Sequence, residues 1–404
     1  MKATPPAQHV DVAALLPAQE RFDGEGGAIA TWVRETYALS RYTTVVACPY
    51  SSVSFAGAQQ VTSHPVYRAF DVAMRGLSRA LAFAARKSFA AAYYRILPEK
   101  IWVYSAFRKI KDARLVHVHN RPHYARMLRG FGYRGVIMLH MHNDLTGYVS
   151  KSAAGEVFES NDGVAFCSEF MMDRAQGEYP EASGLVVIPN GVSRRQITRQ
   201  ERGDRDGSVK LIYAGRIIPE KGPLEAVAVC AELRRRGVDA RIDLVGGTGA
   251  GSDNAPSPYL SQVLKAAHKL NADAGTEVAR VLGPKPHSEV FQLFAENDFF
   301  VYPCEWEEPF GMVALEAMAK GCVPFVPRKG GLPGVVQGGG VVVDAGPGET
   351  VAAFADAIED RLGSSTIDEL RQRGWTRAEQ LTWESIAEVA DGVFERTLSA
   401  RSWE

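Results

Sequence analysis

Two glutamates flank a Phe-Gly pair in the second half of the chain, within the segment FFVYPCEWEEPFGMVALEAMAKG at residues 299–321. The apolar run at its beginning predicts a buried strand, and Pro309 and Gly311 mark the turn into a predicted helix. The first amides of a helix are unpaired donors at a positive helix end, which suits a diphosphate. We therefore predict that the backbone of four residues binds phosphate: Phe310, Gly311, Met312 and Val313.

The two glutamates need a separate explanation, because a carboxylate beside bound phosphates is electrostatically costly. Glu308 lies just before the predicted helix, and Glu316 lies in its second turn. Hydroxyl groups of a sugar or a ribose are the usual reason to keep an acid at such a place. We expect Glu316 to bind a ribose and Glu308 to bind a donor sugar. The alternative is a helix with two solvated acids, which the preceding strand and the flanking glycines disfavour.

A second group of residues lies in the segment LIYAGRIIPEKG, residues 211–222. A predicted strand ends at Gly215 and Arg216, and Lys221 precedes a new helix. Two cations at the carboxyl end of a strand can neutralise the charge that builds up on a departing diphosphate. Metal-dependent enzymes use a divalent ion for this purpose, and Arg216 and Lys221 are the two cations that this segment supplies. The alternative is an exposed Arg and Lys in an ordinary turn.

These motifs resemble retaining glycosyltransferase family 4, in which two Glu separated by seven residues flank a Phe-Gly pair, as in EPFGMVALE here. The resemblance runs from about Gly26 to Lys329 and is strongest after Leu211. It implies the GT-B fold, in which two doubly wound Rossmann-like α/β domains face an interdomain cleft. It also implies transfer of a sugar from a UDP- or GDP-linked donor, with retention at the anomeric carbon and without any cofactor. The family resembles enzymes that use Arg and Lys in place of a metal ion, so we expect catalysis by Arg216 and Lys221 without a metal.

The resemblance also implies roles for residues in the first half of the chain. Two histidine groups end predicted strands, at residues 115–120 and 136–144. His142 resembles the family's histidine that touches the donor sugar, and His140, on the same face of the strand, is the alternative. These histidines could ligate a metal ion, but the resemblance implies no metal site.

Glycines and one strand end complete the predicted donor site. Gly26 and Gly27 precede a predicted helix and resemble the glycine-rich loop of the family, although they do not form a dinucleotide fingerprint. Gly215 lies at a turn into the predicted cleft. Leu282 ends a strand that resembles the segment contacting the nucleotide base.

Short β-rich runs alternate with helical stretches along the chain, which indicates βαβ units and parallel sheets. The first domain is predicted at residues 1–192, a hydrophilic linker at 193–208, and a second domain at 209–366. Residues 367–404 are predicted to form helices that pack back on the first domain. Ligands of open α/β sheets bind beyond the carboxyl ends of the strands, so we expect the donor site between the domains.

Composition and charge limit the class of protein. The chain has 404 residues, of which 46% are hydrophobic, and it shows neither a membrane-spanning apolar run nor a secretory signal. We expect a cytoplasmic protein. Residues 66–134 carry fifteen Lys/Arg against three Asp/Glu, which predicts a partner of negative charge. Aromatic platforms and a binding motif for nucleic acid are not evident, so we expect none to bind.

We interpret the basic stretch as a peripheral contact with the inner face of an anionic membrane that presents a lipid-linked acceptor. Phe70, Met74 and Leu77 recur at helical spacing within residues 66–87, with arginines opposite, as an amphipathic surface helix requires. The alternative is a basic helix that packs on the core of a soluble enzyme acting on a carbohydrate.

The expected function is synthesis of a polysaccharide, a glycolipid or a cell-envelope glycan. Two alternatives stay open. One is another GT-B enzyme that acts on sugar nucleotides, such as an epimerase. The other is a catalytically silent scaffold that binds a nucleotide sugar, since fold does not determine activity.

Overall fold

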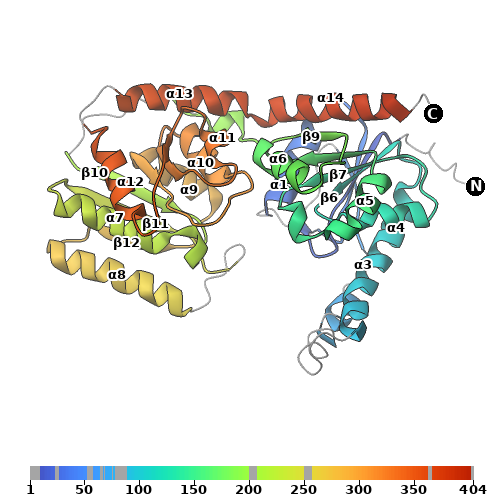
Figure 1. The fold of residues 1–404 in the computed structure, drawn as a ribbon, viewed down its shortest axis with the longest axis horizontal. Helices are drawn as coiled ribbons and strands as arrows, with labels where there is room; N and C mark the ends of the chain where they lie inside the picture. Colours follow the sequence, from blue (N-terminus) through green and yellow to red (C-terminus); the bar gives the residue numbers. More distant parts are fainter. Residues whose placement is uncertain are drawn as a thin grey trace, which may run out of the picture. The chain divides into compact units, whose positions relative to one another are not determined.

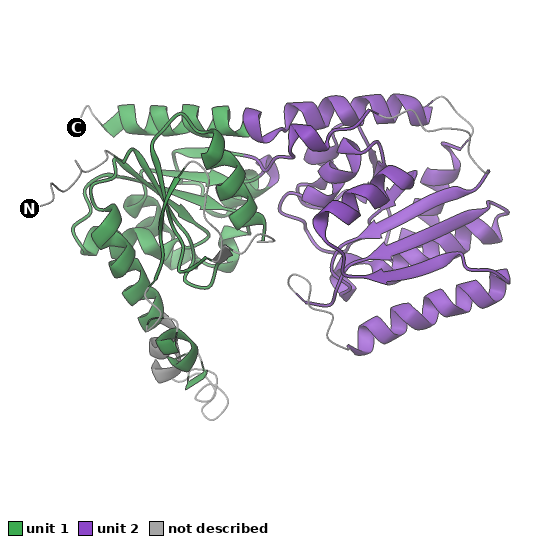
Figure 2. Cartoon of the chain, turned by 180° about the vertical axis from the view of Figure 1, so that it is seen from behind, with its two compact units in different colours: residues 1–167, 171–188, 386–404 green, residues 168–170, 189–385 purple. Residues whose placement is uncertain are grey.

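The chain forms two compact units in the computed structural model, which describes residues 10–22, 27–51, 58–63, 67, 69–74, 76–77, 89–199, 207–249, 257–362 and 366–401. The first unit consists of residues 1–167, 171–188 and 386–404, and the second of residues 168–170 and 189–385 (Figure 2). Each unit has its own parallel sheet, as the alternating pattern predicts.

The first unit contains a seven-stranded parallel sheet in the order β5-β3-β1-β6-β7-β8-β9. Its strands are short runs of Val, Leu, Ile and Ala, most of them buried, as expected when helices cover both faces. The strands are β1 (Val12–Leu15), β3 (Thr44–Ala47), β5 (Ala58–Val61), β6 (Leu115–His119), β7 (Val136–Met141), β8 (Gly163–Phe166) and β9 (Leu185–Val187). A separate pair joins β2 (Arg21–Phe22) to β4 (Tyr50–Ser51).

Helices flank this sheet (Figure 1). They are α1 (Ala28–Leu39), α3 (Phe89–Ile110), α4 (His123–Gly130), α5 (Lys151–Ser160), α6 (Glu169–Glu178) and α14 (Trp383–Arg401). Pro98 lies inside α3. Residues 67, 69–74 and 76–77 are also helical, and of the predicted amphipathic helix Phe70 and Met74 are half-buried while Leu77 is exposed. The arginines predicted on its opposite face lie outside the described residues.

The second unit contains a six-stranded parallel sheet in the order β12-β11-β10-β13-β14-β15. Its strands are β10 (Val209–Ala214), β11 (Ala240–Val245), β12 (Ala279–Gly283), β13 (Phe299–Val301), β14 (Val323–Pro327) and β15 (Val341–Val343). The chain order reverses between β10 and β13, and such a switch point leaves a crevice at the carboxyl ends of the strands. The predicted α/β class with two Rossmann-like domains is confirmed.

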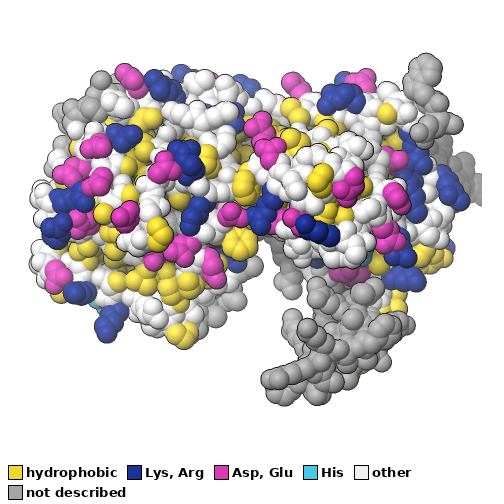
Figure 3. Space-filling view, in the orientation of Figure 1, with side chains coloured by type: hydrophobic (Ala, Val, Ile, Leu, Met, Phe, Trp, Pro, Cys, Tyr) yellow, Lys and Arg dark blue, Asp and Glu magenta, His cyan; other side chains and the backbone are white. Residues whose placement is uncertain are grey.

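The helices of the second unit are α7 (Pro223–Arg235), α8 (Pro258–Ala274), α9 (His287–Glu296), α10 (Met312–Ala319), α11 (Leu332–Val336), α12 (Thr350–Glu359) and α13 (Thr366–Gln380). On the face drawn in Figure 3, acidic and basic side chains are interspersed over this unit. Among the helices that the structure describes, none combines the length and the apolar character that crossing a membrane requires.

The C-terminal segment 367–404 is divided between the two units. In the second unit, Trp375 of α13 packs against Gly321, and Arg371 forms a buried ion pair with Asp298 at 3.3 Å. In the first unit, Asp391 of α14 accepts hydrogen bonds from the Ser40 hydroxyl at 2.6 Å and the Arg41 amide at 2.8 Å. The segment is therefore not one block on the first unit: α13 belongs to the second.

Candidate functional site

The turn after β10 brings a lysine into the interior of the second unit. Gly215 has φ 156° and is followed by the exposed Arg216. A short 3₁₀ turn then carries Lys221, which is 7% exposed. Gly222 has φ 72°, and a Cβ at this position would collide with the carbonyl of Pro303. Only glycine fits both constraints, so the turn packs directly against the end of the neighbouring strand.

Lys221 forms an ion pair with Glu308, with side chains that are 9% and 19% exposed. The Lys221 Nζ also lies 5.9 Å from the ring centroid of Tyr302 and 6.0 Å from that of Trp306. Burial, and next the Glu308 charge, raise the pKa of the Cys304 thiol to about 12. Cys304 is therefore a neutral thiol and not a nucleophile. The structure brings together the two predicted residues Lys221 and Glu308.

Arg216 lies close enough to Glu308 that both charges affect the pKa of the same two tyrosines. Burial raises the pKa of Tyr302 far above its usual range; the Glu308 charge adds to this, while the Arg216 charge opposes it. The pKa of Tyr213 responds to both residues in the same way, and the Tyr213 hydroxyl donates to the Arg216 carbonyl at 2.8 Å. Among the described residues, no acid pairs with the Arg216 side chain. Its guanidinium is therefore available to an anion.

The start of α10 offers free backbone donors. Gly311 caps the helix with φ 102°, where a Cβ would lie 2.5 Å from the Leu332 side chain. The first hydrogen bond of the turn runs from the Ala314 amide to the Gly311 carbonyl at 3.0 Å. The amides before Ala314 have no protein acceptor within the described part of the chain: Phe310, Gly311, Met312 and Val313. They are the residues predicted to bind phosphate.

Two further glycines hold this turn in place. The Gly331 amide donates to the Glu308 carbonyl at 2.7 Å. A Cβ at Gly330 or Gly331 would collide with the backbone of residues 307–310. The loop between β14 and α11 therefore fixes the position of Glu308 next to the helix end.

Glu316 lies one turn further along α10 and is 6% exposed. Its Oε1 is 2.9 Å from Nε2 of His287, the first residue of α9. The predicted base-contacting Leu282 is half-buried near the end of β12, a few residues before His287. Sequence reasoning missed His287. The residue could have been identified by its position, because it begins a helix directly after residues 283–286, on the side of the sheet where ligands bind.

In the first unit, the predicted His142 follows β7 and is 6% exposed. Its Nε2 is 3.0 Å from Nδ1 of His119, and its amide donates to the Asn120 side chain at 2.7 Å. His140 is fully buried, and its Nε2 is 3.1 Å from the Ile188 carbonyl. Of the two alternatives, only His142 therefore retains exposed surface.

The glycine-rich loop is described only at its end. Gly27 is exposed and caps α1. Gly26 lies outside the described residues. Lys221 and Glu308 are in the second unit, and Gly27 and His142 are in the first.

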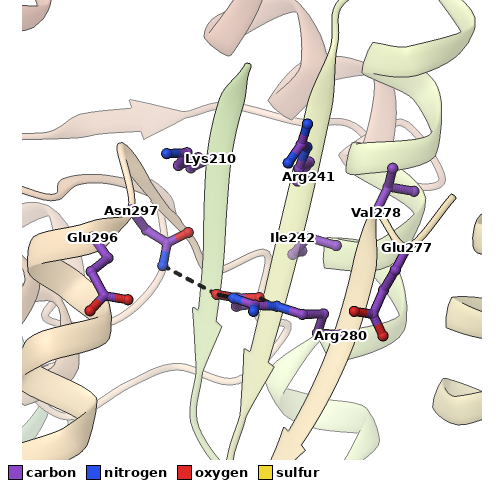
Figure 4. A pocket seen from close by; sticks show the side chains of 9 residues that line it. Lys210, Arg241, Ile242, Glu277, Val278, Arg280, Glu296 and Asn297 are labelled. Carbon is purple, nitrogen blue, oxygen red and sulfur yellow. Dashed lines mark hydrogen bonds and ion pairs between the residues drawn. The ribbon is translucent and has the colours of Figure 1, made fainter. Parts of the chain in front are cut away.

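A pocket of about 530 Å³ lies elsewhere on the second unit (Figure 4). Its lining includes Lys210 and Arg241, which lie near the beginnings of β10 and β11. Arg280 forms a two-pronged ion pair with Asp243 within it, at 2.6 and 2.7 Å. This pocket is at the opposite end of the strands from Gly215 and Lys221, so it is not the predicted donor site.

Comparisons with known proteins agree with this geometry. The family "Glycosyl transferases group 1" matches residues 194–379. Spore coat protein SA of Bacillus subtilis is 26% identical over 78% of this chain and 87% of its own length. The lipopolysaccharide 1,2-N-acetylglucosaminetransferase of Salmonella typhimurium is 24% identical over 68% of this chain and 70% of its own length.

Solved structures show the same fold. The Anabaena protein HepE, in complex with UDP and glucose, superimposes with a TM-score of 0.66 at 16% identity, covering 96% of this chain and 100% of its own. An α,α-trehalose 6-phosphate synthase from Burkholderia multivorans gives a TM-score of 0.73 at 13% identity, covering 98% and 100%. The chain is a glycosyltransferase of the GT-B fold, and its residues 194–379 match the glycosyl transferases group 1 family.

Proposed function

We propose that this enzyme transfers a sugar, with retention of the anomeric configuration, from a UDP- or GDP-linked donor to a carbohydrate or lipid-linked acceptor. One observation carries the proposal: the turn after β10 pairs Lys221 with Glu308, and Glu308 lies in the loop that leads into the unpaired amides of α10. An acid, a cation and backbone donors are what a sugar diphosphate needs, because its two ends differ in charge.

The diphosphate would bind the amides at the start of α10, with Arg216 and Lys221 neutralising its charge. Lys221 is paired with Glu308 in the structure. A phosphate that takes over Lys221 releases the Glu308 carboxylate to accept hydrogen bonds from hydroxyl groups of the donor sugar. Glu316 and His287 would hold the ribose, since their contact places an acceptor and an imidazole together near the end of β12.

The transfer step would occur on one face of the sugar. The bond between the anomeric carbon and the diphosphate oxygen breaks while the acceptor oxygen bonds to that carbon from the same side. The acceptor proton goes to the departing diphosphate. Positioning and charge neutralisation would supply most of the rate, and His142 would contact the sugar from the first domain.

The transfer would take place in the cytoplasm and would contribute to the synthesis of a polysaccharide, a glycolipid or a cell-envelope glycan. The lipopolysaccharide transferase among the relatives supports an envelope glycan. The complex of HepE with UDP and glucose supports UDP-glucose as the first donor to test.

The test is a thermal-shift screen with a panel of nucleotide sugars, followed by mass spectrometry and NMR of products formed with candidate acceptors. We expect a glycoside with the anomeric configuration of the donor, and free nucleoside diphosphate. An altered sugar nucleotide formed without acceptor would identify an epimerase. Binding without turnover of any acceptor would identify a silent scaffold.

A further inference from the structure

Three histidines meet in the interior of the first unit, where the predicted transfer chemistry does not require them. His117 and His119 are on β6, and His140 is on the neighbouring strand β7; each is 0% exposed. The two strands pair in parallel with His119 opposite His140. One ring nitrogen from each histidine lies within 4.8 Å of the other two.

Each of the three rings has one nitrogen occupied by an outer partner. His117 Nδ1 is 2.7 Å from the Tyr37 hydroxyl, His119 Nδ1 is 3.0 Å from His142 Nε2, and His140 Nε2 is 3.1 Å from the Ile188 carbonyl. The remaining nitrogens have no hydrogen-bond partner among the described residues: His117 Nε2, His119 Nε2 and His140 Nδ1. Buried polar atoms are rarely left in this state.

The bond of His140 determines its tautomer. A carbonyl oxygen only accepts, so Nε2 of His140 carries the proton, and Nδ1 is a bare lone pair buried without a donor. In the other two histidines the proton can likewise lie on the nitrogen that contacts the outer partner. Nδ1 of His117 then donates to Tyr37, and Nδ1 of His119 donates to His142. All three unpartnered nitrogens are then lone pairs.

Trp32 of α1 lies against these rings, with centroid separations of 5.4, 5.5 and 4.9 Å from His117, His119 and His140. Its indole excludes water from the cluster. The face of an aromatic ring is negative, so it attracts an N–H group but does not satisfy a lone pair. Trp32 therefore leaves the His140 Nδ1 unexplained.

We propose that His117, His119 and His140 together bind one divalent transition-metal ion, with Zn²⁺ as the best-matched ion. Three neutral imidazoles with an open fourth position form a known type of zinc site, with Zn–N distances of about 2.0–2.1 Å. To bind one ion at this distance, the three ring nitrogens, which lie up to 4.8 Å apart, would have to move closer together. The outer partners act as they do around ligating histidines, holding the second nitrogen and fixing the ring.

The protonation states of the histidines agree with this site. Burial, followed by the charges of neighbouring histidines, holds the pKa of each of the three well below its usual value. They are therefore neutral at physiological pH, which is the form that binds metals. The ion would join β6 to β7 and fix His119, and through His119 the ring of His142.

The test uses protein expressed in zinc-supplemented medium with a purification tag that contains no histidine. Metal content after desalting is measured by plasma mass spectrometry, and we expect about one zinc ion per chain. His140→Gln keeps a donor for the Ile188 carbonyl but removes the ligand, so zinc should be lost. His268→Gln, at an exposed position on α8, is the control and should keep it. Tyr37→Phe should weaken Zn²⁺ binding about 10- to 100-fold, as loss of an outer partner does.

Circular dichroism checks that each variant is folded. If His140→Gln does not fold, Co²⁺ substitution of the unaltered protein decides, because Co²⁺ in a tetrahedral nitrogen site gives intense visible absorption. Zinc-free protein from supplemented medium, zinc retained by folded His140→Gln, or no such Co²⁺ absorption would each overturn the proposal. The histidines would then form only a hydrogen-bonded ring cluster.

Discussion

At the scale of single residues, the proposed donor site contains two acids with different partners. Glu308 pairs with a cation, whereas Glu316 pairs with the His287 imidazole. The contact proposed for Glu308, with the donor sugar, would develop as the transition state forms. The contact proposed for Glu316, with the ribose, would contribute to binding from the start. The two residues should therefore affect different kinetic constants.

We predict that Glu316→Ala weakens binding of free nucleoside diphosphate about 10- to 100-fold, or ~1.4–2.8 kcal/mol, because a ribose contact is lost. Glu308→Ala should mainly lower kcat, since its contact develops with the transition state. Calorimetry with the nucleoside diphosphate and steady-state kinetics separate the two effects. Glu305→Ala, an exposed acid in the same loop, is the control. If Glu308→Ala lost nucleotide affinity while Glu316→Ala kept it, the assigned roles would be wrong.

Lys221 should matter more than its small exposed surface suggests. Lys221→Met removes a charge that stabilises the departing diphosphate, and we expect kcat to fall about 10²- to 10³-fold. The measurement is product formation at saturating donor. Lys265→Met, at an exposed position on α8, should leave the rate unchanged. Unaltered turnover of the Lys221 variant would show that the lysine only balances Glu308.

At the scale of elements, glycines bring the turns of the proposed donor site into contact. Gly222 carries the Lys221 turn against Pro303, and Gly330 and Gly331 carry a second loop against Glu308 and Pro309. These are close approaches of backbone to backbone, where even a methyl group has no room. The geometry of the site thus depends on residues that have no side chain.

The cost of adding a methyl group can be measured at Gly222. Gly237 is also left-handed, with φ 90°, but a Cβ there meets no atom within 4 Å. Gly237→Ala should therefore lower the free energy of unfolding by only ~1–2 kcal/mol, the cost of the left-handed backbone. Gly222→Ala adds the collision, so we expect ~3 kcal/mol or more, together with reduced turnover. Equal losses from the two variants in chemical denaturation would refute the close approach.

The elements around the donor motifs were predictable from the sequence because their signals are local. The strand before Gly215 matches β10, and the helix after Gly311 is α10. In contrast, β1 is a fully buried strand between β3 and β6, yet its alanine-rich sequence VAAL has little β propensity. Packing on both faces of the sheet stabilises β1 as a strand, and that packing cannot be inferred from a single sequence.

Contacts between distant segments also could not be predicted from the sequence. The pairing of β6 with β7 puts three histidines together, and the contact of His287 with Glu316 joins α9 to α10. Each histidine taken alone fits an ordinary buried or surface position. The sequence indicated the strand-end histidines as possible metal ligands but not which of them meet, and it gave no sign of the contact between His287 and Glu316, because both contacts depend on strand register and helix packing.

At the scale of the whole molecule, the basic stretch remains a proposed membrane contact. Helix α3 exposes Ile101 and Tyr104 near the exposed cations Lys100, Arg108 and Lys109. This mixture is typical of a helix that lies on an anionic surface. Each cation near such a surface contributes roughly 1 kcal/mol and is screened by salt.

We predict that the protein co-sediments with vesicles in proportion to their anionic lipid content and dissociates at high salt. Replacing Lys100, Arg108 and Lys109 with Glu should abolish sedimentation. The same replacement of Lys265 and Lys269, on the second unit, should not. Protein that stays in the supernatant even at low salt would rule out the membrane contact and favour a soluble acceptor.

The central claim is that two side-chain cations, Arg216 and Lys221, take the place of a metal ion at the departing diphosphate. The most direct test is the rate of sugar transfer in EDTA, with and without added Mg²⁺ or Mn²⁺. Mg²⁺ and Mn²⁺ prefer oxygen ligands and would not replace a zinc ion bound by the first unit's histidines, so restoration by these two ions keeps the two questions separate. We predict the same rate in all three conditions. Loss of turnover in EDTA that Mg²⁺ or Mn²⁺ restores would contradict the account.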